Sequence, residues 1–204
     1  MIFNDFGGLF VAFDGPNGVG KSTLIEKVCA NLEHLSVDIW VTKEPTNTLL
    51  GEFTRQIAES LEGESLACLV ASDRYCHLRD EVIPKLKNDY LVITDRYILS
   101  SLILQRMDNV NKEFILAINE KVILPDLQIV VTADKKAIQT RLSERNNLTR
   151  FERGQRTDEE LAFLREGVNE LSRLGTEVIE IDNTGGLNDS VVSYDYGKHF
   201  VDII

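Results

Sequence analysis

The stretch from Gly15 to Ser22 has the residue types and spacing of a site for phosphate groups. It fits the pattern Gly-x4-Gly-Lys-Ser in full. Glycines let consecutive backbone N–H groups point at phosphate oxygens, and Lys21 supplies a point charge for the β- and γ-phosphates of a triphosphate. The Ser22 hydroxyl suits Mg²⁺. We therefore predict that ATP is bound by Gly15, Pro16, Asn17, Gly18, Val19, Gly20, Lys21, Ser22 and Thr23.

A second group of polar residues, Asp95-Arg96-Tyr97, follows the apolar run 90–94 directly. If that run is a strand, Asp95 lies at the sheet edge where the phosphate loop also begins, and it can serve as the acidic partner around Mg²⁺. An arginine beside it suits a second anion, because its bidentate fork matches a phosphate on an acceptor molecule. The alternative is a structural salt bridge at a strand end.

Two further motifs are ambiguous from the residues alone. Asp73-Arg74-Tyr75 lies in a helical segment, where a solvated face is the usual place for an arginine. Lys43-Glu44-Pro45 follows another apolar run. It could line an acceptor pocket, or it could be an ordinary polar turn.

The segment 141–158 is rich in arginine although the chain as a whole is acidic. Arginines that close over a transferring phosphoryl group stabilise its charge and exclude water. We predict a mobile basic loop between two helices that acts as a lid, with solvated arginines as the alternative for some of its members. We favour Arg150, because Phe151 beside it could anchor the loop, and then Arg145 and Arg141. The arginines of the segment are Arg141, Arg145, Arg150, Arg153 and Arg156.

Short Val- and Ile-rich runs alternate with longer segments of helical periodicity. This alternation predicts one α/β domain over residues 1–204, with a five-stranded parallel sheet between helices and ligands at the carboxyl ends of the strands. Pro84 is expected to kink or split one long helix. The expected strands are 9–13, 37–42, 90–94, 127–132 and 177–181, and the expected helices 20–34, 47–60, 64–88, 97–107, 111–122, 134–146, 158–174 and 188–203.

Composition excludes several classes of protein. The net charge of −11 argues against binding a nucleic acid polymer or a membrane through a basic surface. No apolar run approaches the length of a membrane span, and the first residues lack the basic region of a signal peptide. Three cysteines without a CxxC pair argue against a disulfide framework or a zinc site. We expect a cytoplasmic protein.

Taken together, these motifs resemble those of the thymidylate kinases, P-loop nucleoside monophosphate kinases that phosphorylate dTMP. The similarity runs in order and spacing from about residue 9 to residue 182. Its most specific part is Asp95-Arg96-Tyr97 with the serines and the glutamine that follow. The matching stretches are Phe13 to Thr23, Thr42-Lys43-Glu44-Pro45, Asp73-Arg74, Asp95 to Gln105, Pro125-Asp126-Leu127 and the lid residues Arg141, Arg145 and Arg150-Phe151-Glu152.

The resemblance implies a three-layer P-loop NTPase fold, a homodimer built from helices, and Mg²⁺-dependent transfer from ATP to dTMP that gives dTDP and ADP. It implies that Arg96 binds the acceptor phosphate, that Arg74 contacts the base, and that Ser22 and Asp95 surround the metal. The electrostatic catalysts would be Lys21, Arg96, Arg150 and Arg145. The substrate would be bound by Asn17, Glu44, Val70, Arg74, Arg96, Ser101, Leu104 and Gln105.

Several departures from the family pattern fall on the acceptor side. Asn17 stands where the family has an Asp that reaches the sugar 3′-hydroxyl, and Val70 stands where it has a Phe that stacks on thymine. Leu104 replaces an aromatic residue beneath the deoxyribose, and Lys43 replaces an Arg. One alternative is therefore a kinase for another pyrimidine or a modified nucleoside monophosphate. Another is a nucleotide-binding module that transfers nothing, which would be expected to lack the lid arginines or Asp95-Arg96.

Overall fold

The computed structural model describes residues 1–186 apart from 34–35, 146–147 and 154–156. The helix expected at 188–203 and Arg156 lie outside the described residues. The elements in chain order are β1 (Leu9–Asp14), α1 (Lys21–Leu32), β2 (Ile39–Lys43), α2 (Leu49–Ile57), α3 (Gly63–His77), η1 (Leu78–Val82), α4 (Ile83–Leu86), β3 (Leu91–Asp95), α5 (Ile98–Met107), α6 (Lys112–Ile118), β4 (Leu127–Thr132), α7 (Lys135–Ser143), α8 (Arg150–Arg153), α9 (Thr157–Arg173) and β5 (Glu177–Asp182).

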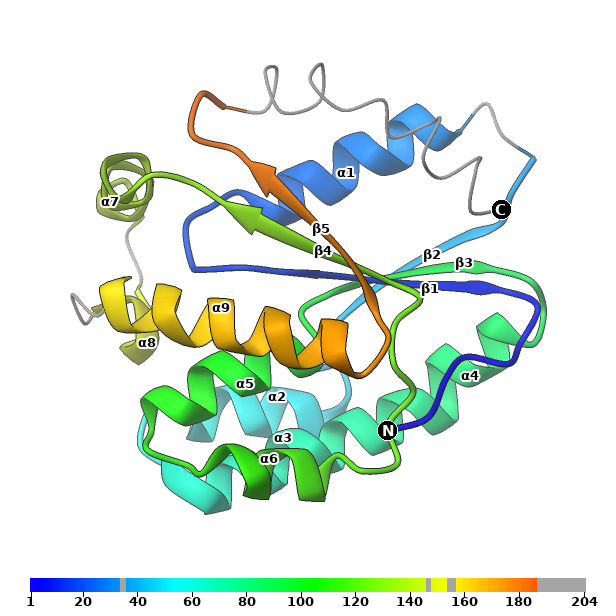
Figure 1. Cartoon of the computed structure of the whole chain (residues 1–204), viewed down its shortest axis with the longest axis horizontal. Helices are drawn as coiled ribbons and strands as arrows, with labels where there is room; N and C mark the ends of the chain where they lie inside the picture. Colours follow the sequence, from blue (N-terminus) through cyan, green and yellow to red (C-terminus); the bar gives the residue numbers. More distant parts are fainter. Residues whose placement is uncertain (34–35, 146–147, 154–156, 187–204) are drawn as a thin grey trace.

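The five strands form one parallel sheet in the order β2-β3-β1-β4-β5, which confirms the predicted fold class (Figure 1). β1 is central, and Phe13 lies in register with Asp95 of β3, which in turn pairs with Lys43 of β2. Because parallel strands end at the same edge, the segments after β1, β2 and β3 meet there. The phosphate loop, Glu44 and Arg96 are brought together in this way.

Side chains that alternate along β1 build two separate cores, one on each face of the sheet. Val11 and Phe13 pack with apolar residues of α1 and α7. Phe10 and Ala12 face the larger helical layer, which includes α3, α5 and α9 (Figure 1). The inner strands β1, β3 and β4 are buried on both faces, which explains why they are continuous apolar runs in the sequence.

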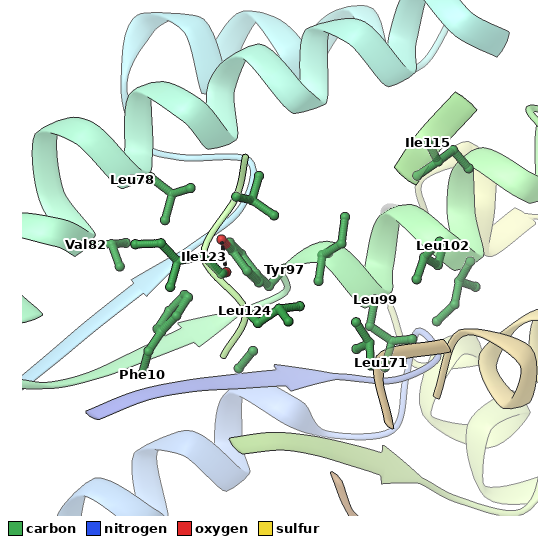
Figure 2. Packing of buried hydrophobic residues seen from close by; sticks show 14 of the residues in the cluster. Phe10, Leu78, Val82, Tyr97, Leu99, Leu102, Ile115, Ile123, Leu124 and Leu171 are labelled. Carbon is green, nitrogen blue, oxygen red and sulfur yellow. Dashed lines mark hydrogen bonds between the residues drawn. The ribbon is translucent and has the colours of Figure 1, made fainter. Parts of the chain in front are cut away.

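Tyr97 stands at the centre of the larger core, as Figure 2 shows. Its ring meets Phe10 edge to face at 4.9 Å, and its hydroxyl donates to the Ile123 carbonyl at 2.8 Å. Burial together with this one hydrogen bond fixes the residue that follows Arg96. The apolar packing therefore helps to position the functional edge of the sheet.

The expected helix 64–88 is divided in the structure. α3 ends at His77, the π-helical turn η1 follows, and α4 begins at Ile83 with Pro84 in its first turn. Pro84 has no N–H to donate, so a regular α-helical ladder cannot run through it. The Ile83 N–H instead donates to the Leu78 carbonyl, the longer spacing of a π turn.

The arginine-rich segment is not a loop throughout, and its start overlaps the expected helix 134–146. Arg141 belongs to α7, and the segment contains the short helix α8. Within the described residues, no helix is long and apolar enough to cross a lipid bilayer.

Phe10 tests the larger core. Its side chain is fully buried, so Phe10→Ala should lower the free energy of unfolding by about 3–5 kcal/mol through lost burial and a residual cavity. Denaturant unfolding measures this, with the exposed Glu26→Ala on α1 as a control expected to change the value by less than about 0.5 kcal/mol. A loss for Phe10→Ala no larger than that of the control would contradict the packing described.

Candidate active site

The phosphate loop connects β1 to α1 through glycines whose positive φ angles disfavour other residues. Gly15 has φ 147°, and a Cβ there would lie 2.1 Å from the Val131 carbonyl oxygen. Gly20 has φ 89° and forms the N-cap of α1 without a side-chain cap, so the first-turn N–H groups stay open toward the loop. This backbone geometry is suited to the phosphate group that the sequence predicts here.

Lys21 points back into this loop. Its ammonium donates to the carbonyls of Gly15 and Pro16, both at 2.9 Å, and the side chain is 7% exposed. Burial, followed by the repulsion of Arg96, lowers the pKa of Lys21 to about 7. Bound phosphates would favour the charged form again.

Ser22 and Asp95 offer hard oxygen ligands at one point. The Ser22 hydroxyl donates to Asp95 Oδ2 at 2.6 Å, whereas Asp95 Oδ1 is buried without a hydrogen-bond partner. Nowhere in the described parts of the chain do three or more His, Cys, Asp or Glu residues gather as a metal cluster. A hydroxyl and one carboxylate fit Mg²⁺, which takes few protein ligands and completes its shell with phosphate oxygens and water.

Arg96 lies between the phosphate loop and a neighbouring pocket. Its backbone has φ 75°, and its N–H donates to the Phe13 carbonyl at 2.8 Å. The guanidinium donates to Asn17 Oδ1 at 2.6 Å and to Ser100 Oγ at 3.0 Å. In the part of the chain that the structure describes, no ion pair joins Arg96 to a carboxylate. The structural salt bridge considered as an alternative is absent there, and the fork remains suited to an anion.

Asp14 holds Arg96 in place indirectly, through Ser100. Its carboxylate is fully buried and accepts from the Ser100 hydroxyl and from Gln128 Nε2, the latter at 3.2 Å. Burial raises the pKa of Asp14, although the Ser100 hydrogen bond and the charge of Arg96 oppose this shift. The chain of contacts Asp14, Ser100, Arg96, Asn17 links the end of β1 to the loop above it.

The neighbouring pocket has a volume of about 290 Å³ and opens beside Arg96. Its lining includes all eight residues predicted to bind the substrate. Val70 and Leu104 are half-buried on its apolar side, and Gln105 is buried with its Oε1 unpartnered. The residues that the structure brings together here are Asn17, Glu44, Val70, Arg74, Arg96, Ser101, Leu104 and Gln105.

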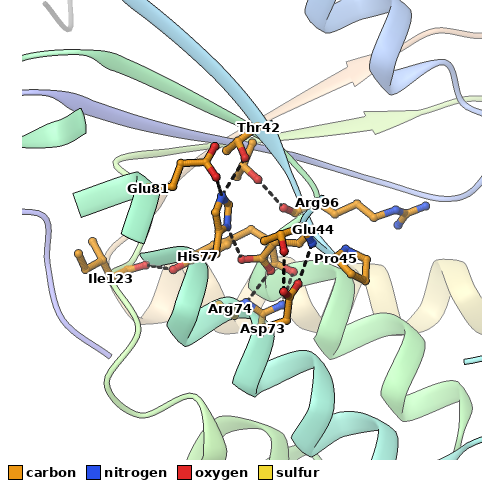
Figure 3. A network of polar contacts seen from close by, with 12 residues as sticks. Thr42, Glu44, Pro45, Asp73, Arg74, His77, Glu81, Arg96 and Ile123 are labelled. Carbon is orange, nitrogen blue, oxygen red and sulfur yellow. Dashed lines mark hydrogen bonds and ion pairs between the residues drawn. The ribbon is translucent and has the colours of Figure 1, made fainter. Parts of the chain in front are cut away.

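The expectation of a solvated Arg74 was wrong, because its side chain is only 1% exposed. Nε donates to Glu44 Oε2 at 2.8 Å (Figure 3). Nη2 donates to Ser101 Oγ at 2.9 Å. The adjacent Asp73 accepts from the Thr46 N–H at 2.7 Å. The Asp-Arg pair on α3 therefore holds the loop that follows β2, and the reading of Lys43-Glu44-Pro45 as a mere polar turn is also wrong.

The lid arginines lie in different places. The Arg150 guanidinium pairs with Asp108 at 2.5 Å and stacks 4.1 Å from the Phe151 ring, and Phe151 lines the pocket. Arg145 pairs with Glu152 at 2.7 Å. Arg141 instead reaches the phosphate loop, donating to the Val19 carbonyl at 3.4 Å. The catalytic role of Arg150 and Arg145 stays a prediction, and it requires that both leave these partners.

Two residues near the loop were missed by the sequence analysis. Asn183, after β5, donates to the Val19 carbonyl at 2.7 Å. Glu160 of α9 is 9% exposed, accepts from the backbone of Asn17, and has a raised pKa because it is buried, opposed in part by Arg96 and Lys21. Neither belongs to a local motif, so only the folded chain identifies them.

The lowered pKa of Lys21 predicts a proton uptake. At pH 8 free Lys21 should be mostly neutral, and a bound triphosphate should raise its pKa, so about one proton is taken up on binding; at pH 6, where Lys21 is already charged, this uptake should vanish. Calorimetry with a non-hydrolysable triphosphate analogue in buffers of different ionisation enthalpy measures it. The variant Lys21→Arg stays charged at both pH values, so any proton uptake that it shows comes from the ligand and not from residue 21. Equal uptake by both proteins at pH 8 would show that Lys21 is already charged.

Comparison with known proteins places this geometry in one family. The family model described as "Thymidylate kinase" matches residues 13–192. A thymidylate kinase of Caldicellulosiruptor saccharolyticus is 32% identical over 193 residues, which cover 89% of this chain and 91% of that protein. A probable thymidylate kinase of Caldivirga maquilingensis is 40% identical over 149 residues, covering 71% and 73%.

A solved structure supports the same fold. The thymidylate kinase of Candida albicans superimposes with a TM-score of 0.73 at 19% identity, and the alignment covers 96% of this chain and 92% of that one. With the phosphate loop, the Asp95-Arg96 pair and the pocket at one sheet edge, the family match spans the whole site. This chain belongs to the thymidylate kinase family.

Proposed function

We propose that this protein transfers the γ-phosphoryl group of ATP to dTMP, giving dTDP and ADP. The observation that carries the proposal is the position of Arg96. Its backbone N–H donates a hydrogen bond to the Phe13 carbonyl at the start of the phosphate loop, and its side chain lines the neighbouring pocket. A monophosphate on this fork would present its oxygens toward the end of a triphosphate bound by the loop.

The donor side uses groups that need little rearrangement. The open N–H groups of α1 and the Lys21 ammonium would bind the phosphates of ATP. We propose that Ser22 and the unpartnered Asp95 Oδ1 hold Mg²⁺. When bound, this ion neutralises charge on the β- and γ-phosphates.

The acceptor side combines an apolar pocket with a few polar groups, as ligand pockets usually do. Val70 and Leu104 would contact the base and the sugar, and the free oxygen of Gln105 could accept from a base N–H. An ionised acceptor phosphate needs no general base, so positioning and charge neutralisation can carry the reaction. Lys21 and Arg96 supply that charge, and Arg145 and Arg150 would add to it on lid closure.

Assembly as a homodimer remains part of the proposal. α2 presents Leu49 and Phe53, which are 87% and 51% exposed in the single chain. Two apolar side chains one turn apart on a helix are suited to packing against another helix.

The acceptor is tested by ADP release measured with ATP, Mg²⁺ and a panel of dTMP, dUMP, dCMP and dGMP. The proposal predicts the highest kcat/KM for dTMP. A higher value for another pyrimidine would support the alternative suggested by Asn17, Val70 and Leu104. No turnover with any acceptor, despite ATP binding, would identify a non-catalytic nucleotide-binding protein.

Arg96 provides the sharpest substitution. Arg96→Met keeps much of the length of the side chain but removes its charge and its donors, so kcat/KM for the monophosphate should fall by about 10²–10³-fold. Affinity for ATP should change little, because the phosphate loop remains. Arg96→Lys restores the charge without the fork and should be intermediate. A fall below tenfold for Arg96→Met would contradict the assignment of the acceptor phosphate to Arg96.

A further inference from the structure

His77 is a buried polar residue that the proposed chemistry does not use. It ends α3, its side chain is fully buried, and polar groups from two elements surround the ring (Figure 3). Nδ1 lies 3.1 Å from Glu44 Oε1, and Nε2 lies 2.9 Å from Thr42 Oγ1. Glu81 Oε2 lies 3.8 Å from Nε2.

These contacts fix which ring nitrogen carries the proton. A carboxylate only accepts hydrogen bonds, so Nδ1 must carry a hydrogen and donate to Glu44. A threonine hydroxyl both donates and accepts, so Thr42 matches Nε2 with or without a proton. The contact between Nδ1 and Glu44 is therefore a directed hydrogen bond, and its direction does not depend on the charge of the ring.

Glu44 transmits this bond to the pocket. Oε1 accepts from His77, and Oε2 accepts from Arg74 Nε at 2.8 Å, while the Glu44 side chain is 4% exposed. The other end of the Arg74 guanidinium donates to Ser101 Oγ at 2.9 Å, and Arg74 and Ser101 line the pocket. One line of buried contacts therefore runs from His77 through Glu44 and Arg74 to the pocket wall.

The backbone on both sides of Glu44 is held independently of His77. The Glu44 N–H donates to the Asp95 carbonyl at 3.0 Å, and Thr46 is bound by Asp73 through its N–H and its hydroxyl. His77 therefore does not position the Glu44 backbone, and its hydrogen bond instead fixes the rotation of the Glu44 side chain. Loss of the Nδ1 donor would leave Oε1 buried and unpaired, which favours rotation of the carboxylate away from Arg74.

The turn η1 keeps the ring itself in place. It follows His77 directly and carries Glu81, whose Oε1 accepts from the Trp40 indole N–H at 2.6 Å while Oε2 faces His77. Trp40 and Thr42 both lie on β2, so this edge strand reaches Nε2 directly through Thr42 and indirectly through Glu81. A π turn at this point suits a positioning device, because such turns often mark functional sites.

We propose that His77 is a positioning residue for the acceptor pocket: its Nδ1–H orients Glu44, and Glu44 orients the Arg74 guanidinium toward the bound monophosphate. The inference rests on the proposed function in one respect, namely that this pocket receives the acceptor. His77 itself is not among the residues that line the pocket. Its loss should therefore act on the acceptor and leave the donor site unaffected.

Two substitutions separate the two ring nitrogens. The amide nitrogen of an asparagine can lie near the place of Nδ1, so His77→Asn keeps a donor for Glu44 and gives up Thr42. The amide of a glutamine reaches the place of Nε2, so His77→Gln keeps a partner for Thr42 and gives up Glu44. Both remove a buried ring and both should lower the melting temperature.

The measurement is KM for dTMP, KM for ATP and kcat in both variants. His77→Gln should raise KM for dTMP about tenfold, as expected when a hydrogen bond to a charged group is lost, with KM for ATP unchanged. His77→Asn should restore most of that loss. Asp126→Asn is the control for destabilisation alone. Asp126 lies just before β4 and does not line the pocket, and its carboxylate accepts a hydrogen bond from the Phe10 N–H.

Equal KM values for dTMP in the two His77 variants, or a rise that Asp126→Asn reproduces at the same loss of melting temperature, would overturn the proposal. A crystal structure of substrate-free His77→Gln provides a readout that does not depend on activity. The Glu44 carboxylate should have turned from Arg74 Nε in it, and an unchanged Glu44–Arg74–Ser101 geometry would refute the relay. If the wild type phosphorylates no monophosphate, the proposed function fails while this structural test still decides the relay.

Discussion

The site depends on a short ladder of backbone hydrogen bonds across the carboxyl ends of three strands. The Arg96 N–H donates to the Phe13 carbonyl, and the Glu44 N–H donates to the Asp95 carbonyl. These bonds join the ends of β1, β3 and β2, so the phosphate loop, Arg96 and Glu44 share one frame. Arg96 adopts φ 75° to do this, a conformation uncommon outside glycine that persists only where the surrounding structure imposes it.

This frame is suited to binding two anions although the chain as a whole is acidic. Three cationic side chains lie near the same edge of the sheet, namely Lys21, Arg96 and Arg74. Burial and hydrogen bonds hold the nearby carboxylates in place. Burial lowers the pKa of Lys21 and raises the pKa values of Asp14 and Glu160. In each case burial disfavours the charged form of the side chain, so less charge is buried in the free site. Arriving phosphates would reverse that balance locally, whatever the net charge of the chain.

The sequence was sufficient for the features that local patterns encode. The buried strands appear as apolar runs, and the phosphate loop is contiguous. The fold class and the position of Lys21, Ser22 and Asp95 at one edge of the sheet could therefore be predicted from it. Arg74 was different: as an isolated residue on a helix it suggested solvent, and the fold buries it against Glu44. That contact spans 30 positions and exists only because α3 packs beside the loop after β2.

The same reason accounts for His77, Glu160 and Asn183, which no spacing rule singles out. They become neighbours of the site through sheet order and helix packing. In the lid, the run of arginines predicted a basic segment, but it did not predict which groups each arginine contacts. Arg150 extends to Asp108 beyond α5, and Arg141 reaches the phosphate loop from α7.

In the proposed reaction, Arg96 receives the acceptor phosphate beside the phosphate loop. The most direct measurement is a crystal structure with dTMP and a non-hydrolysable ATP analogue. We expect the dTMP phosphate on the Arg96 guanidinium, facing the γ-phosphate, with the Arg96–Asn17 hydrogen bond released or shared. A dTMP phosphate bound elsewhere, with Arg96 still bonded to Asn17 and Ser100 as in the free protein, would contradict it.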